Sequence, residues 1–143
     1  MSTNAIDCYQ IVWLVRRLFR ALGQKSNEGL QKFGISAADR AVLEFLYPDE
    51  ELSVPNIAAR YQVSRQHVQV TVNTLLNGKL LTTKDNPRHK RSPLIALTAN
   101  GRKLFSRIKD LDYKTVEKLF SATSAKERHT TQKTLETLLA QLR

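Results

Sequence analysis

Apolar residues recur every three or four positions through most of the chain, a spacing that is typical of amphipathic helices. This spacing predicts a first helix over residues 5–33, which contain no proline, and it reappears from Thr98 to the C-terminal end. Ser124 to Glu127 forms a capping box that divides this last region into two helices. The helical spacing is interrupted over residues 80–98, where two short apolar runs flank a polar tip and predict a β-hairpin.

Helix-start signals place three short helices in the middle of the chain. The first begins at a capping box from Ser36 to Asp39, in which Asp replaces the usual Glu. The second begins at Ser53, with Pro55 in its first turn, where a missing N–H has no cost. The third begins at Ser64, after a tight turn. These signals predict two short helices that lead into a third helix and then into the hairpin.

The order of these elements favours a mainly α fold with a small β wing of two or three strands. Such a fold is a winged helix-turn-helix flanked by N- and C-terminal dimerisation helices. We expect an N-terminal helix over residues 1–34, a winged helix-turn-helix lobe over residues 35–98, and C-terminal helices over residues 99–143. Because the flanking helices carry more leucine than the lobe could cover, we expect them to join two chains in a homodimer.

The tip of the predicted hairpin is strongly basic. Asp85 is its one nearby carboxylate, and its four potential cations are Arg88, His89, Lys90 and Arg91. Cations at a hairpin tip can contact the phosphates or the minor groove of a DNA duplex. The hairpin therefore predicts a contact with nucleic acid.

The helix that precedes the hairpin, over residues 64–77, has an apolar side and an amide-rich side. Val68, Val72 and Leu75 cluster on the side that we expect to be buried. Amides can pair with adenine edges, a valine can touch a thymine methyl group, and a helix N-terminus suits a phosphate. The alternative is that the polar side is only solvated. The candidate DNA-binding residues of this helix are Ser64, Arg65, Gln66, His67, Gln69, Val70 and Asn73.

The charge of the chain favours a polyanionic partner. There are 23 Lys and Arg residues against 13 Asp and Glu, for a net charge of +10. The excess is cleanest over residues 56–98, which hold seven Lys and Arg and one acid. Double-stranded DNA is the partner that this distribution favours. Two other functions stay open: an architectural protein that coats DNA without sequence preference, and a winged-helix module that binds a protein.

Four stretches together resemble the MarR-type winged-helix transcription regulators of bacteria and archaea. Residues 57–65 resemble the helix-turn-helix core of that family, and residues 75–81 resemble the end of its recognition helix and the start of its wing. Residues 86–91 lie on the wing motif Asp-Pro-x-Asp-Arg-Arg, and residues 97–101 match the closing Leu-Thr-x-x-Gly. The resemblance covers roughly residues 30–105.

The chain departs from the family pattern at the wing. Asn86 and His89 replace the two aspartates, so the tip is more basic and lacks carboxylates that could pair with its arginines. The glycine before the wing is displaced, with Lys79 in its place and Gly78 one residue earlier. Contact between the wing and DNA is still implied, but the usual salt bridges within the wing are not.

The resemblance implies a dimeric repressor whose two recognition helices enter successive major grooves of a roughly palindromic site. It also implies that a small phenolic or anionic effector binds in a crevice beside the lobe. A place for Trp13 in the dimer core is the alternative to a role in that crevice. The candidate pocket residues are Tyr9, Trp13, Arg16, Arg17 and Tyr47.

Cys8 is the one cysteine of the chain, so an internal disulfide is excluded. Some relatives sense peroxides through a cysteine in the first helix, but no His or Lys adjoins Cys8, and an inert thiol is the alternative. The three histidines lack metal-ligand spacing, and no nucleophile elbow or phosphate loop is present. We therefore expect no metal, no cofactor and no enzyme activity. Because the chain has neither a long apolar run nor an export signal, we expect a cytoplasmic protein without a membrane span.

Overall fold

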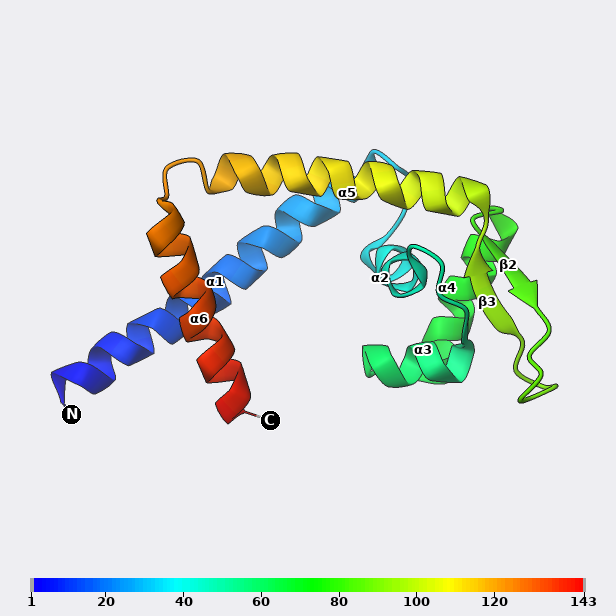
Figure 1. Cartoon of the computed structure of the whole chain (residues 1–143), viewed down its shortest axis with the longest axis horizontal. Coiled ribbons are helices and arrows are strands. Elements are labelled where there is room, and N and C mark those ends of the chain that lie inside the picture. The colour runs from blue at the N-terminus through cyan, green and yellow to red at the C-terminus, as the bar shows by residue number, and fades with distance from the viewer. Residues whose placement is uncertain (1, 143) are drawn as a thin grey trace. The chain divides into compact units, whose positions relative to one another are not determined.

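The computed structural model describes residues 2–142, which form mainly helices with one small antiparallel sheet (Figure 1). This confirms the predicted fold class of a winged helix-turn-helix with flanking helices. The chain divides into two compact units, Met1–Lys109 and Asp110–Arg143, and the boundary falls inside the fifth helix. The elements are α1 Thr3–Gln31, α2 Ala37–Leu46, β1 Leu52–Ser53, α3 Val54–Tyr61, α4 Arg65–Asn77, β2 Leu81–Lys84, β3 Leu94–Leu97, α5 Ala99–Leu119 and α6 Ala125–Gln141.

The predicted helix starts are confirmed by their hydrogen bonds. The Ser36 Oγ accepts from the Asp39 backbone N–H at 3.1 Å, and the Asp39 carboxylate accepts in return from the Ser36 N–H at 2.9 Å. The hydroxyls of Ser53 and Ser64 cap α3 and α4 in the same manner. Between these two helices, Gln62 has a φ of 59°, in the left-handed region that allows the tight turn. Local capping therefore fixes where α2, α3 and α4 begin.

The core of the first unit is formed by α2, α3, α4 and the sheet, together with Leu30 of α1 and the N-terminal part of α5. Phe105 and Ile108 of α5 are each 1% exposed, so this helix packs on the lobe before it continues into the second unit. The predicted lobe, which ends at residue 98, did not include these two side chains. The largest fully buried side chains are Phe105, Leu43, Leu46, Ile57, Ile95, Ile108, Val42, Val68 and Val72.

The sheet has the strand order β1-β3-β2, and both pairs are antiparallel. The hairpin of β2 and β3 agrees with the prediction, with Thr82 opposite Ala96. The sequence allowed a third strand but did not locate it. That strand is β1, which pairs Leu52 with Ile95 just before Ser53 caps α3. It ties the start of the helix-turn-helix to the base of the wing.

The closing motif at residues 97–101 holds the end of the wing on the end of α4. The Thr98 hydroxyl donates to the Lys79 carbonyl at 2.7 Å and accepts from the Gly101 N–H at 3.0 Å. The Thr98 N–H donates to the Leu80 carbonyl at 3.1 Å. Lys79 has a φ of 59°, which favours glycine, so this lysine occupies the left-handed position that the family gives to glycine. None of the helices within residues 2–142 combines the length and apolar character required to cross a membrane.

Gly101 is required by a close approach to the Leu80 backbone. A Cβ at position 101 would lie 2.0 Å from the Leu80 carbonyl oxygen, a distance that no packing can accommodate without a shift. We expect Gly101→Ala to lower the free energy of unfolding by about 1–3 kcal/mol or more. Gly23→Ala is the matched control, because nothing lies within 4 Å of a Cβ there and α1 is helical. The control should gain about 0.5–1 kcal/mol. Urea unfolding at one protein concentration measures both, and equal midpoints for the two variants would contradict this packing.

Candidate nucleic-acid interface

One side of α4 is buried and the other side faces outward. Val68 and Val72 are 0% exposed and Leu75 is 2% exposed, which confirms the predicted apolar side. Thr71 is also buried, and its hydroxyl donates to the His67 carbonyl within the helix. The burial of Thr71 was not predicted, although this residue lies beside Val68 and Val72 on the helix surface. The predicted DNA-binding residues of this segment are all exposed, namely Ser64, Arg65, Gln66, His67, Gln69, Val70 and Asn73.

Contacts between side chains order the exposed side of α4. The Gln69 Nε2 donates to the Asn73 Oδ1 at 2.9 Å, so two of the predicted base-reading amides are joined. The His67 ring lies 6.5 Å from the Tyr61 ring, which in turn lies 5.8 Å from Phe45. The first turn of α4 is therefore packed against α3 and, through Tyr61, against α2.

The wing tip carries exposed cations that form no ion pair with any carboxylate of residues 2–142. Within the described residues, no ion pair joins Arg88, Lys90 or Arg91 to an acid, and His89 is also exposed. Lys84, at the base of the wing, differs because its Nζ lies 2.6 Å from the Glu51 carboxylate. The tip cations therefore remain available to an external polyanion.

Asn86 organises the tip where the related family motif has an aspartate. Its Oδ1 accepts from the Arg88 backbone N–H at 3.1 Å, and its Nδ2 donates to the Ser92 carbonyl at 2.8 Å. A carboxylate could accept the first hydrogen bond but could not donate the second. The neutral amide thus closes the tip without using a positively charged side chain.

A cavity of about 350 Å³ joins the recognition helix to the wing. Arg65, Gln66 and Gln69 of α4 line it together with Arg91 of the wing, while Pro55 and Pro93 supply part of its apolar wall. Arg91, which is distant in sequence, is therefore brought beside the guanidinium and the two amides of α4. This arrangement suits a surface that contacts the phosphates and the base edges of one duplex.

The residues of the predicted effector pocket make separate contacts in the structure. Tyr47 packs against Phe105, with ring centroids 5.0 Å apart, and the Lys109 ammonium lies 5.2 Å from the Tyr47 ring. Tyr9 and Trp13 are more than half exposed on α1. Arg17 lines an open depression with other residues of α1. A shared pocket for Tyr9, Trp13, Arg16, Arg17 and Tyr47 stays a prediction.

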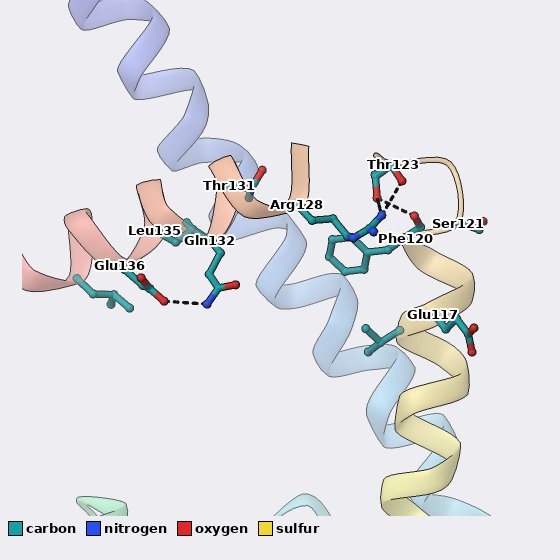
Figure 2. Close-up of a pocket in the computed structure, with 11 residues that line it drawn as sticks. Glu117, Phe120, Ser121, Thr123, Arg128, Thr131, Gln132, Leu135 and Glu136 are labelled. Carbon is teal, nitrogen blue, oxygen red and sulfur yellow. Dashed lines mark hydrogen bonds between the residues drawn. The ribbon is translucent and has the colours of Figure 1, made fainter. Parts of the chain in front are cut away.

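The second unit contains a groove that the sequence analysis did not foresee. It has a volume of about 690 Å³ and lies between the end of α5 and α6 (Figure 2). Val116, Phe120, Leu135 and Leu139 give it an apolar lining. At one end, Arg128 donates through Nη1 to the Thr123 carbonyl at 2.6 Å. The helical spacing of these apolar residues is visible in the sequence. The distance between α5 and α6, which leaves the groove open, is not.

The remaining candidate residues add no chemistry to the site. Cys8 is exposed on α1, and its thiol donates to the Asn4 Oδ1 at 3.6 Å, within the same helix. A redox role for this thiol stays a prediction. Residues 2–142 contain no group of three or more His, Cys, Asp or Glu side chains that could hold a metal ion.

Sequence comparisons relate the chain to a family of regulators. The family model described as the MarR family matches residues 33–92, which include α2, α3, α4 and most of the wing. An uncharacterized protein of Mycobacterium tuberculosis is 33% identical over 102 residues, which is 71% of this chain and 66% of that protein. The matched region thus spans slightly less than two thirds of this curated relative.

Structural comparisons extend the likeness to nearly the whole chain. The crystal structure of the MarR family transcription regulator SP03579 matches with a TM-score of 0.85 and 25% sequence identity. The match covers 97% of this chain and 94% of that chain. The crystal structure of a MepR–DNA complex from Staphylococcus aureus has a TM-score of 0.77 and 24% identity, with 92% of this chain and 96% of that chain covered. The latter shares the fold and contains DNA.

Proposed function

We propose that this chain is a member of the MarR family and a sequence-specific, double-stranded DNA-binding transcription regulator. Because the proteins that it resembles are transcription regulators, we also propose that the chain has no enzyme activity. We further propose that the chain acts in the cytoplasm as a homodimeric repressor on a roughly palindromic operator. The observation that carries the proposal is the exposed amide side of α4 beside a wing tip of unpaired cations.

The two parts of this surface suit different features of a duplex. The width of α4 suits the major groove, where Gln66, Gln69, Val70 and Asn73 would meet base edges. Ser64 and Arg65, at the start of the helix, would contact a phosphate, since helix N-termini favour anions. The wing cations Arg88, His89, Lys90 and Arg91 would follow the flanking minor groove or its phosphates. His67 would lie beside the base-reading residues, with its ring directed by Tyr61.

The alternative functions differ in what the α4 surface should contain. An architectural protein needs cations and few base-reading groups, because backbone contacts alone supply non-specific affinity. A module that binds proteins would favour an apolar patch on α4, whereas Val70 is the one large apolar side chain among the predicted contact residues. The exposed amides of Gln66, Gln69 and Asn73 can contact base edges, and they favour base reading over both alternatives.

Selection of bound duplexes from a random pool tests the proposed function directly. We expect the full chain to recover one site with two related half-sites, about one helical turn apart from centre to centre. The recovered duplex should bind about 10³-fold or more tightly than a scrambled duplex at physiological salt. Equal affinity for both duplexes at several salt concentrations would support the architectural alternative. Absence of binding to either duplex would support the protein-interaction alternative.

The wing assignment predicts a change in salt dependence. Arg88→Ala combined with Arg91→Ala should weaken binding to recovered and scrambled duplexes alike. The slope of log affinity against log salt should fall by roughly one unit for each lost phosphate contact. The control is Lys126→Ala with Lys133→Ala, which removes the same charge from the side of α6 opposite Leu135. A slope that changes equally in both double variants would refute the wing as a DNA contact.

Homodimerisation is supported by apolar surface that neither unit buries. Helix α6 contains no buried residue, and two of its leucines, Leu135 at 38% exposed and Leu139 at 57% exposed, line the groove in the second unit. Apolar side chains of α1 are exposed as well, up to 79% for Phe19. Contiguous apolar surface of this kind is rare in monomers and marks an interface. We propose that helices of a second copy cover both surfaces, and that an effector acts by changing the separation of the two lobes.

The dimer proposal predicts a sedimenting mass twice that of the chain at micromolar concentration, with an interface above about 2,000 Å². Leu135→Lys with Leu139→Lys should dissociate the dimer, because four charged side chains would enter one apolar interface. The Lys126→Ala, Lys133→Ala control should remain dimeric, since those lysines lie on the other side of α6. A parent protein that sediments as a folded monomer would contradict the proposal.

A further inference from the structure

The hydrogen bond between Gln69 and Asn73 has a consequence for how α4 can read bases. The two residues lie four positions apart, so they are neighbours on one side of the helix. Both are exposed, and the bond from the Gln69 Nε2 to the Asn73 Oδ1 is 2.9 Å long. Behind them, Val68 and Val72 are fully buried and fix the rotation of the helix. The two amides are therefore held on a rigid support and oriented by each other.

This bond uses one donor of Gln69 and one acceptor site of Asn73, and it fixes the two amides relative to each other. A single amide reads adenine by accepting from the N6 amine with its oxygen and donating to N7 with its nitrogen. The Asn73 oxygen is directed towards Gln69, and one Gln69 N–H is used in the same bond. Each amide keeps its other donor and acceptor groups, but the bond restricts the directions in which these groups can point. The Gln69 Oε1 and the Asn73 Nδ2 take no part in the bond, and both are oriented by it.

We propose that Gln69 and Asn73 read DNA as one unit, in which Gln69 supplies the acceptor and Asn73 supplies the donor. The Asn73 Nδ2 donates to a purine N7 or a carbonyl oxygen of a base, and the Gln69 Oε1 accepts from an exocyclic amine of adenine or cytosine. The two contacts fall on the same base pair or on neighbouring pairs, which stack about 3.4 Å apart. Removal of either side chain then disorders the other, so the unit determines specificity as a whole.

A thermodynamic cycle on operator variants tests this joint reading, which rests on the proposed function. The parent, Gln69→Ala, Asn73→Ala and the double variant are each titrated with the selected operator and with duplexes changed at single base pairs. We expect both single variants to lose roughly 10-fold discrimination at the same base pairs, which corresponds to one good contact. The double variant should lose little more discrimination than either single variant, because each of the three variants removes the same joint interaction.

Two further variants separate joint reading from the loss of individual contacts. Asn73→Asp keeps the oxygen that accepts from Gln69 but loses the donor, so discrimination should fall only at the base that Asn73 contacts. Gln66→Ala with Asn73→Ala is the control cycle on the same helix side, and its losses should multiply, since no bond between Gln66 and Asn73 is present among the described contacts.

The outcomes distinguish the inference from the function on which it rests. Joint reading would be overturned if Gln69→Ala and Asn73→Ala lost discrimination at different base pairs and these losses multiplied in the double variant. The sequence-specific function would then still stand. A parent that binds every duplex equally would overturn the function and the joint reading together. Circular dichroism of the variants confirms folding, which we expect to be unchanged because both side chains are exposed.

Discussion

The burial of Val68 and Val72 is the constraint on which the exposed surface depends. Both side chains are fully enclosed by the core of the first unit, and their burial contributes about 1.5–3 kcal/mol for each side chain. A rotation of α4 by one residue would expose part of this stripe and would bury amides without partners, which costs more still. The register of the buried side thus determines which polar groups face outward. The proposed base reading by Gln66 or Asn73 would therefore depend on valines that lie outside the proposed contact surface.

A second constraint fixes the position of the wing relative to α4. The carbonyls of Lys79 and Leu80, at the end of α4, both accept hydrogen bonds from Thr98, at the start of α5. Gly101 allows the first turn of α5 to approach the Leu80 backbone. The hairpin is therefore closed at its base by the hydroxyl and the backbone N–H of Thr98, and β1 adds a third strand on the other side of β3. This closure is why Arg91 can line the same cavity as Arg65 and Gln66.

Local signals made most of the architecture predictable from the sequence. Capping residues such as Ser36 and Ser64 act within a few residues, and the spacing of Val68 and Val72 reports directly on a buried helix side. Strand β1 could not be located, because two residues are too short for an alternating pattern and their pairing with β3 is distant in sequence. The core role of Phe105 was likewise hidden, since a continuous helical pattern does not reveal where a helix passes from one unit to the next.

The candidate site was predictable in its residue types but not in its connections. Spacing placed Gln69 and Asn73 on one outward side, yet only side-chain geometry shows that one donates to the other. The loss of the wing aspartates was visible in the sequence, whereas the ability of Asn86 to bridge Arg88 and Ser92 required the folded tip.

Because Asn86 bridges Arg88 and Ser92 with a neutral amide, the conformation of the wing tip does not depend on its charged side chains. A tip closed by an ion pair would loosen as salt screens the pair, and part of its positive charge would be neutralised internally. The Asn86 amide neither titrates nor responds strongly to ionic strength, so the tip keeps its form under conditions that weaken its attraction for a polyanion. Changes in salt would then alter the strength of binding without altering the conformation that binds, so a cell could tune the occupancy of the protein on DNA without unfolding its contact surface.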